Sequence, residues 1–99
     1  MNNLNLKIKS IAINDMEKIA DYIADDNKSA SLKMLNLFYK SFNDLCKYPE
    51  MGVSRKDFTY KEVRFSKVYK HYLVVYNFDN ENVYILRVLS NYQNICELL

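Results

Sequence analysis

The side chains best suited to chemistry in this 99-residue chain are cations that gather in its second half. From Met51 to Tyr72 there are six lysines and arginines against two acids, so the local net charge is 6 − 2 = +4. The six cations are Arg55, Lys56, Lys61, Arg64, Lys67 and Lys70. A basic stretch of this kind attracts phosphate backbones or an acidic protein partner. Charge alone is equally consistent with a solvated strand face.

His71 and Arg87 are two further candidates. His71 is the single imidazole of the chain and stands at the start of a predicted strand, where a surface or structural role is commoner than general-base catalysis. Arg87 lies within the apolar run VYILRVL, and a guanidinium there requires a carboxylate, a carbonyl or an open cleft. A salt bridge to an acid on the helices would satisfy it. Alternatively, Arg64 and Arg87 converge with Lys67 and Lys70 on a phosphate or an acidic partner.

Most familiar enzyme motifs are absent from the sequence. There is no glycine-rich phosphate loop, no HExxH, no CxxC and no nucleophile elbow. Cys46 and Cys96 are too few for a disulfide framework, and with one histidine they are also too few for a zinc site. We therefore expect no metal and no cofactor, and two buried free thiols that suit a reducing cytoplasm.

The composition predicts one folded domain over residues 1–99. Apolar residues make up 49% of the chain, with one Gly and one Pro, which argues against disorder. No apolar run approaches the ~20 residues of a membrane span. Met1–Ile13 interleaves polar residues where a secretory signal would be apolar. We expect a cytoplasmic protein with no membrane attachment.

A strand followed by a helix is predicted at the beginning of the chain. The alternating pattern from Leu4 to Ile13 predicts the strand. Asn14 and Glu17 have the spacing of a capping box, which would begin a helix that lasts to about residues 25–28.

A second, longer helix should follow almost at once. It begins near Asn27 or Ser29 and stops before Pro49, because the residue before a proline is pushed out of the helical region. Its apolar stripe comprises Ala30, Met34, Leu37, Phe38, Phe42 and Leu45. The short acidic break between the two helices predicts an antiparallel helical hairpin.

The second half of the chain is predicted to be a sheet. Strands from Lys61 to Val68, Tyr72 to Phe78 and Val83 to Leu89 are rich in β-branched and aromatic residues. Both faces of the middle strand are apolar, which marks a central strand, and Asp79–Asn82 forms the turn of a hairpin. The tail from Asn91 to Leu99 is too short for a stable helix without docking.

These elements predict an α+β fold in the order β-α-α-β-β-β, with a helical hairpin packed on one face of an antiparallel sheet. In a monomer of 99 residues the opposite, partly apolar face would remain uncovered. A large exposed apolar surface with basic residues at its edge is typical of a partner-binding site. We therefore expect a protein partner.

The sequence resembles the RelE/ParE superfamily of type II toxin-antitoxin toxins over nearly its whole length. The segments that carry the resemblance are AINDMEKIADYIADDN (12–27), the L-x-x-Y-P-x-x-G stretch (45–52), VRF (63–65), YLVVY (72–76) and ILRVL (85–89). Their order and spacing agree with the predicted layout. The resemblance implies a small cytoplasmic toxin that inhibits growth and is neutralised by a cognate antitoxin, whose C-terminal segment wraps the toxin as helix and strand.

Two activities occur in that superfamily. RelE-like members are ribosome-dependent mRNA endonucleases, and the residues that would serve as catalytic groups here are Arg64, Lys67, His71, Arg87 and Tyr92. Such nucleases tend to place an arginine where this chain has Leu73, and a cation after the last strand, where it has Ser90-Asn91. ParE-like members inhibit DNA gyrase, and the Tyr-Ile pair of the first helix and the Arg-Val-Leu of the last strand are closer to their pattern.

The ParE-like interpretation predicts DNA gyrase as the target and a role in plasmid stabilization. Its partner-binding residues would be Arg64, Lys67, Lys70, Arg87 and Tyr92. One alternative is a RelE-like ribonuclease that acts with the ribosome on mRNA, and another is a degenerate, non-toxic module that only binds antitoxin. Arg64→Ala and Arg87→Ala should abolish toxicity and leave the thermal midpoint within a few degrees, because an exposed cation contributes less than ~1 kcal/mol to stability.

Overall fold

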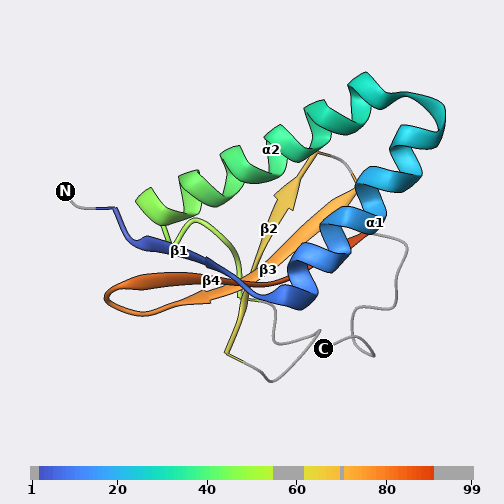
Figure 1. The fold of residues 1–99 in the computed structure, drawn as a ribbon. Coiled ribbons are helices and arrows are strands. Elements are labelled where there is room, and N and C mark those ends of the chain that lie inside the picture. The colour runs from blue at the N-terminus through green and yellow to red at the C-terminus, as the bar shows by residue number, and fades with distance from the viewer. Residues whose placement is uncertain (1–2, 55–61, 70, 91–99) are drawn as a thin grey trace.

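The computed structural model describes residues 3–54, 62–69 and 71–90. In these parts of the chain, two helices pack on one face of a four-stranded sheet (Figure 1). The elements are β1 (Asn5–Ile8), α1 (Ser10–Asp26), α2 (Lys28–Lys47), β2 (Arg64–Val68), β3 (Tyr72–Phe78) and β4 (Asn82–Ser90). The predicted α+β fold and its element order are confirmed.

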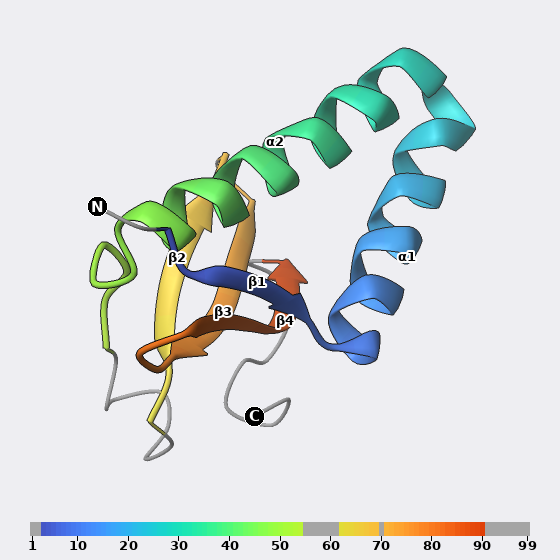
Figure 2. The ribbon, with the colours of Figure 1, turned by 60° about the vertical axis from the view of Figure 1, so that its left-hand side comes forward.

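The sheet is mixed, with the spatial order β1-β4-β3-β2. β3 runs antiparallel to both β2 and β4, whereas β1 runs parallel to β4, with Asn5 opposite Asn82. Figure 2 shows β1 lying beside β4. The prediction of a wholly antiparallel sheet is therefore wrong for β1. An alternating pattern determines which side chains face the core, but it does not determine the direction of the neighbouring strand.

The junction between β1 and α1 differs from the prediction. Helix α1 begins at Ser10, so a strand that continues to Ile13 and a capping box at Asn14–Glu17 are both wrong. The N-cap is Lys9, which makes no side-chain cap bond, and its backbone N–H donates to the carbonyl of Ile85 at 2.9 Å. The run SIAI fits either element, because four residues are too few to distinguish a period of 2 from a period of 3.6.

Helix α2 begins and ends as predicted. The side chain of Asn27 accepts a hydrogen bond from the N–H of Ala30 at 3.0 Å, which caps the helix. The helix ends at Lys47, as the nearby proline requires. The hydroxyl of Ser31 donates to the carbonyl of Ala20 at 2.7 Å, so the two helices are also bonded to each other.

The main core lies between the helical hairpin and the sheet. Its fully buried side chains include Phe38, Phe42, Leu45, Val74, Tyr76, Val83 and Ile85. The ring of Phe38 packs edge-on against Tyr72, with their centroids 5.5 Å apart. Leu37, which was predicted to belong to the buried stripe of α2, is instead 41% exposed.

The second face of the sheet also carries buried apolar side chains. Val63, Phe65, Val75 and Leu89 form a separate buried cluster, and Leu86 packs against it. The expectation of an uncovered apolar face is therefore wrong for these residues.

The predicted turn between β3 and β4 is confirmed. The carboxylate of Asp79 accepts the backbone N–H groups of Glu81 and Asn82, each at 2.8 Å, and the hydroxyl of Tyr84 at 3.1 Å. These bonds, with that from Glu81 the strongest, hold the pKa of Asp79 below its ordinary value.

Candidate functional site

Two adjoining hollows lie between the helical hairpin and the sheet. The first has a volume of about 330 Å³, and its lining includes Ala30, Lys33, Met34, Leu37 and Tyr69. The second has a volume of about 490 Å³, and its lining includes Lys18, Ile19, Tyr22 and Ser90. His71 and Tyr72 line both hollows. We call the two together the hairpin groove.

The hairpin groove is largely apolar, with cations at its rim. Its lining contains Lys18, Lys33 and His71 but no described aspartate or glutamate. Burial, followed by the neighbouring Tyr22, raises the pKa of Tyr72, so this phenol stays neutral. The groove can therefore bind an amphipathic segment that combines apolar side chains with carboxylates.

The turn that follows β2 borders the groove and is strained. Tyr69 has a φ of 55°, in the left-handed region that non-glycine residues rarely adopt. Its exposed ring packs edge-on against His71, with the centroids 6.0 Å apart. Backbone strain of this kind persists only where the surrounding structure holds it, and it clusters at binding sites.

The loop that follows α2, residues 48–53, forms a second candidate surface, which we call the post-helix loop. The hydroxyl of the buried Tyr76 donates to the carbonyl of Pro49 at 2.7 Å and accepts the N–H of Gly52 at 2.8 Å. The guanidinium of Arg64 donates to two carbonyls of the loop, at 3.1 and 2.7 Å. Two side chains of the sheet therefore hold this loop from inside.

Gly52 is required by this arrangement. A Cβ atom there would collide with the Tyr76 hydroxyl oxygen and lie 2.6 Å from its ring carbon Cε1. Glycine lets the ring approach the backbone. Burial raises the pKa of Tyr76 and outweighs the opposite effects of the Gly52 N–H and of Arg64. The phenol therefore keeps the proton that it donates to Pro49.

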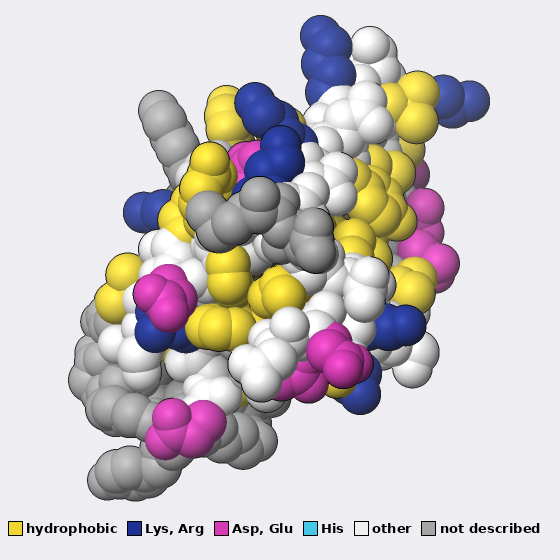
Figure 3. Space-filling model, turned by 90° about the vertical axis from the view of Figure 1, so that its left-hand side faces the viewer, with side chains coloured by type: hydrophobic (Ala, Val, Ile, Leu, Met, Phe, Trp, Pro, Cys, Tyr) yellow, Lys and Arg dark blue, Asp and Glu magenta, His cyan; other side chains and the backbone are white. Residues whose placement is uncertain are grey.

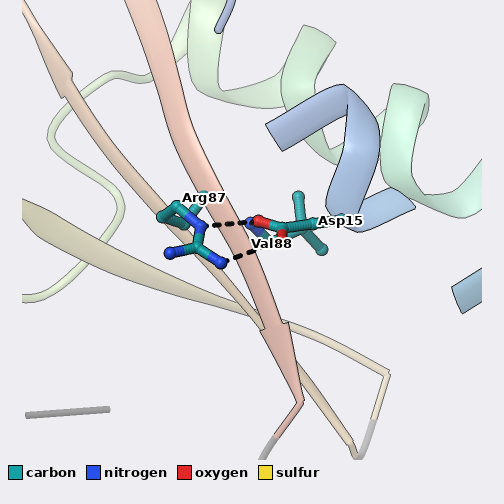
Figure 4. Close-up of polar contacts among 3 residues, drawn as sticks. All are labelled: Asp15, Arg87 and Val88. Atoms are coloured by element: carbon teal, nitrogen blue, oxygen red, sulfur yellow. Dashed lines mark hydrogen bonds and ion pairs between the residues drawn. The ribbon is translucent and has the colours of Figure 1, made fainter. Parts of the chain in front are cut away.

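Arg87 on β4 binds Asp15 on α1 (Figure 4). Its Nε and Nη2 atoms donate to the two carboxylate oxygens, at 2.8 and 2.9 Å. The same carboxylate accepts the backbone N–H of Val88 at 3.0 Å, beyond the last residue of β4 that pairs with β1. The hydrogen bond to Asp15 raises the pKa of Arg87. The predicted salt bridge from Arg87 to an acid of the helices is thus confirmed.

The described cations do not converge on one site. Arg64 binds the post-helix loop, whereas Arg87 binds α1. Lys67 is exposed on β2, and His71 is exposed in the lining of the hairpin groove. The remaining candidates that lie outside the described residues are Lys70 and Tyr92.

The sequence patterns did not indicate Asp15 or Tyr76 as site residues. The two loop groups that the Tyr76 hydroxyl binds lie 24 and 27 residues away in the sequence, so no local pattern joins them. The available signal was the single glycine, Gly52, because an isolated glycine often marks a close approach of another group to the backbone.

Residues 3–54, 62–69 and 71–90 contain no group of three or more His, Cys, Asp or Glu side chains that could hold a metal ion. In the same parts of the chain, no helix has both the length and the apolar character needed to cross a membrane. Cys46 is a buried free thiol, as predicted, and its burial raises its pKa. Cys96 lies outside the described residues.

Comparison with known proteins adds evidence on the family. Residues 6–95 match the family model of the ParE toxin of the type II toxin-antitoxin system, parDE. Among solved structures, the chain is similar to the chromosomal ParDE TA system from P. aeruginosa, with a TM-score of 0.72 and 19% identity over 88% of this chain and 95% of that chain. No curated protein matches the sequence. At this identity the structural likeness establishes the fold, whereas the family model spans nearly the whole sequence. The chain therefore belongs to the ParE toxin family of type II toxin-antitoxin systems.

Proposed function

We propose that this protein inhibits DNA gyrase and is neutralised by a cognate antitoxin that binds in the hairpin groove. Membership of the ParE toxin family supports the toxin part, and the structural neighbour is a ParDE TA system. The observation that carries the antitoxin part is the hairpin groove, whose apolar lining is flanked by lysines and contains no described carboxylate.

An antitoxin segment that fits the groove presents apolar side chains on one face and carboxylates at its edges. Leu37 and Tyr22 are 41 and 79% exposed, so covering them removes apolar surface from water. Lys18 on α1 and Lys33 on α2 can pair with the carboxylates, and such pairs accelerate association. Because these charges are near the surface, the affinity should fall as the salt concentration rises.

Gyrase inhibition is proposed from the ParE-like pattern of the chain, and it requires a cytoplasmic location. Among the partner-binding residues proposed for it, Arg64 and Arg87 act through the segments that they hold, which are the post-helix loop and α1. Lys67 is exposed and can contact the partner directly. Lys70 and Tyr92 remain candidates from the sequence alone.

The RelE-like ribonuclease has less support. Attack of an RNA 2′-hydroxyl on the adjacent phosphate requires a base, an acid and cations around one phosphate. Arg64 and Arg87 are engaged with two different partners, so this pair does not surround a single phosphate.

Gyrase-catalysed supercoiling of relaxed plasmid, with titrated toxin and with or without antitoxin, tests the function. We expect dose-dependent inhibition with trapped cleaved DNA, and reversal by the antitoxin. Normal supercoiling at a large molar excess of folded toxin would count against gyrase as the target. Primer extension on translated mRNA would then test the ribosomal alternative, and unaffected growth after induction would favour the non-toxic module.

The antitoxin site is tested by Leu37→Ser in the groove and by the matched control Leu32→Ser, an exposed leucine elsewhere on α2. Leu37→Ser should raise the antitoxin concentration needed for half-reversal by about tenfold. The control should leave that concentration unchanged. Equal effects of the two replacements would exclude the groove as the antitoxin site.

A further inference from the structure

The post-helix loop carries three exposed apolar side chains within residues 48–53. Tyr48, Met51 and Val53 are 62, 52 and 59% exposed. Exposed apolar side chains concentrated in one short loop are typical of protein-binding surfaces, where tyrosine and methionine are enriched. Figure 3 faces the end of the molecule that carries β1 and the C-terminal end of α2, and it shows hydrophobic side chains exposed among charged ones.

The loop is ordered from inside. The side chains of Tyr76 and Arg64 form four hydrogen bonds with the loop backbone. Val53 exchanges two further backbone hydrogen bonds with Phe65 on β2, at 2.9 and 2.8 Å. A segment that is already ordered loses little conformational entropy when it binds, so the loop is preorganised for a partner.

The loop is separated from the hairpin groove by the C-terminal half of α2. Leu37 is the residue of α2 in the groove lining that lies nearest the loop, and Tyr48 follows the last turn of the helix, a separation of 48 − 37 = 11 residues. At 1.5 Å per residue this corresponds to roughly 16 Å along the helix axis. The two surfaces can therefore bind different partners.

The surroundings of the loop favour a protein over a nucleic acid. Among the residues that the structure describes, the charged side chains near the loop have both signs: Lys47 and Glu50 are exposed, and Glu62 and Arg64 share a hollow of about 210 Å³. A phosphate backbone is attracted by a basic patch, and mixed charges do not provide one. Three exposed apolar side chains on a loop whose backbone is held in place suit an apolar depression on a folded protein.

We propose that the post-helix loop is the surface by which this toxin binds its target protein. Tyr48, Met51 and Val53 contact an apolar depression on that protein, and Tyr76 and Arg64 are positioning residues. This assignment rests on the proposed function, in which the target is DNA gyrase. It places target binding and antitoxin binding at opposite ends of α2.

The test compares the double variant Tyr48→Ser/Met51→Ser with the control Leu32→Ser/Tyr39→Ser, which replaces two α2 side chains that are 64 and 45% exposed. Each full-length protein is titrated into the gyrase supercoiling assay and induced in growing cells, and circular dichroism checks that it is folded. The loop variant should need about tenfold more protein for half-inhibition and should not arrest growth. The control should stay within about twofold of wild type in both measurements.

Tyr76→Phe tests the positioning role, because it removes the hydroxyl and keeps the three exposed side chains. Well below its thermal midpoint, where the variant is folded, a higher concentration of Tyr76→Phe than of wild type should be needed for half-inhibition of gyrase. A purely structural role would lower the midpoint and leave that concentration unchanged, which would remove Tyr76 as a positioning residue.

Inhibition and growth arrest at wild-type levels by the loop variant would overturn the proposal. The proposal would also be overturned if the loop variant inhibited gyrase normally but was no longer reversed by the antitoxin, because the loop would then bind the antitoxin. If wild-type protein arrests growth without inhibiting gyrase, the proposed target is wrong, and the growth assay of the variants still decides the role of the loop. Folded wild-type protein with neither effect would overturn both proposals.

Discussion

Asp15 and Arg87 lie 72 residues apart in the sequence and form a two-point ion pair that joins the first helix to the last strand. Both side chains are largely buried, with 12 and 17% of their surfaces exposed. The carboxylate also accepts the N–H of Val88, so it replaces a strand partner where β1 has ended. This pair therefore belongs to the framework of the fold.

Breaking this pair should destabilise the protein. Asp15→Ala removes the carboxylate from a largely buried guanidinium and the acceptor from the Val88 N–H, so the free energy of unfolding should fall by about 3 kcal/mol. Arg87→Ala should have a similar effect, because Arg87 is not the exposed cation that the sequence suggested. Urea denaturation measures both changes, and the exposed Asp21→Ala on α1 should cost less than about 0.5 kcal/mol. If the losses in the free energy of unfolding simply add in the double variant Asp15→Ala/Arg87→Ala, the two side chains do not stabilise each other.

Removing the Tyr76 hydroxyl should also destabilise the fold. Tyr76→Phe leaves the carbonyl of Pro49 and the N–H of Gly52 without this partner, at an expected cost of about 2 kcal/mol. The matched control is Tyr22→Phe, which removes the hydroxyl of a tyrosine that is 79% exposed and should change little. Thermal unfolding compares the two variants. Equal midpoints would show that water satisfies the loop in the absence of the hydroxyl.

The N-cap of α2 should contribute measurably to stability. Asn27→Ala removes the acceptor of the Ala30 N–H, and we expect a loss of about 1 kcal/mol. Asn36→Ala, exposed within the same helix, should be neutral or slightly stabilising because alanine is the better helix former. Both are read from urea unfolding curves. A similar change in the two variants would mean that the cap bond has no net effect.

The turn at Asp79 should make stability depend on pH in the acid range. The folded-state pKa of Asp79 lies below its ordinary value of 3.8, so the charged carboxylate stabilises the fold above that pH. This contribution is lost as the pH falls through the folded-state pKa. The difference in thermal midpoint between wild type and Asp79→Ala should therefore shrink below pH 3.8. Asn80→Ala in the same turn is the uncharged control. A difference in thermal midpoint between wild type and Asp79→Ala that did not change with pH would exclude the mechanism.

Local sequence patterns predicted the sheet better than the junction of the first strand and helix. The bounds of β3, Tyr72–Phe78, agree with the prediction because an apolar run on both faces ends at clear turn residues. The second helix was correctly predicted to begin near Asn27, whereas the capping box predicted at Asn14 is wrong. The start of α1 depends on where pairing with β4 stops, and a parallel pair between distant segments leaves no local signature.

The candidate sites could be predicted only in part. The need of Arg87 for a partner followed from its apolar surroundings, but the choice of Asp15 depends on how α1 packs against β4. Gly52 indicated a turn, and its partner Tyr76 lies 24 residues further on. Leu37 has the spacing of a buried residue but is 41% exposed. Helical periodicity gives the apolar face of a helix, but it does not give how much of that face the sheet covers.

The parallel pairing of β1 with β4 also constrains when the protein can fold during its synthesis. Asn5 meets its partner Asn82 only 82 − 5 = 77 residues later, so the first strand waits for the last one to leave the ribosome. Contacts between such distant residues slow folding, because a long loop must close before they form. A nascent chain that stops before β4 has neither this pair nor the bond between Asp15 and Arg87. The native fold, and any toxicity that depends on it, is therefore reached only after β4 has been made.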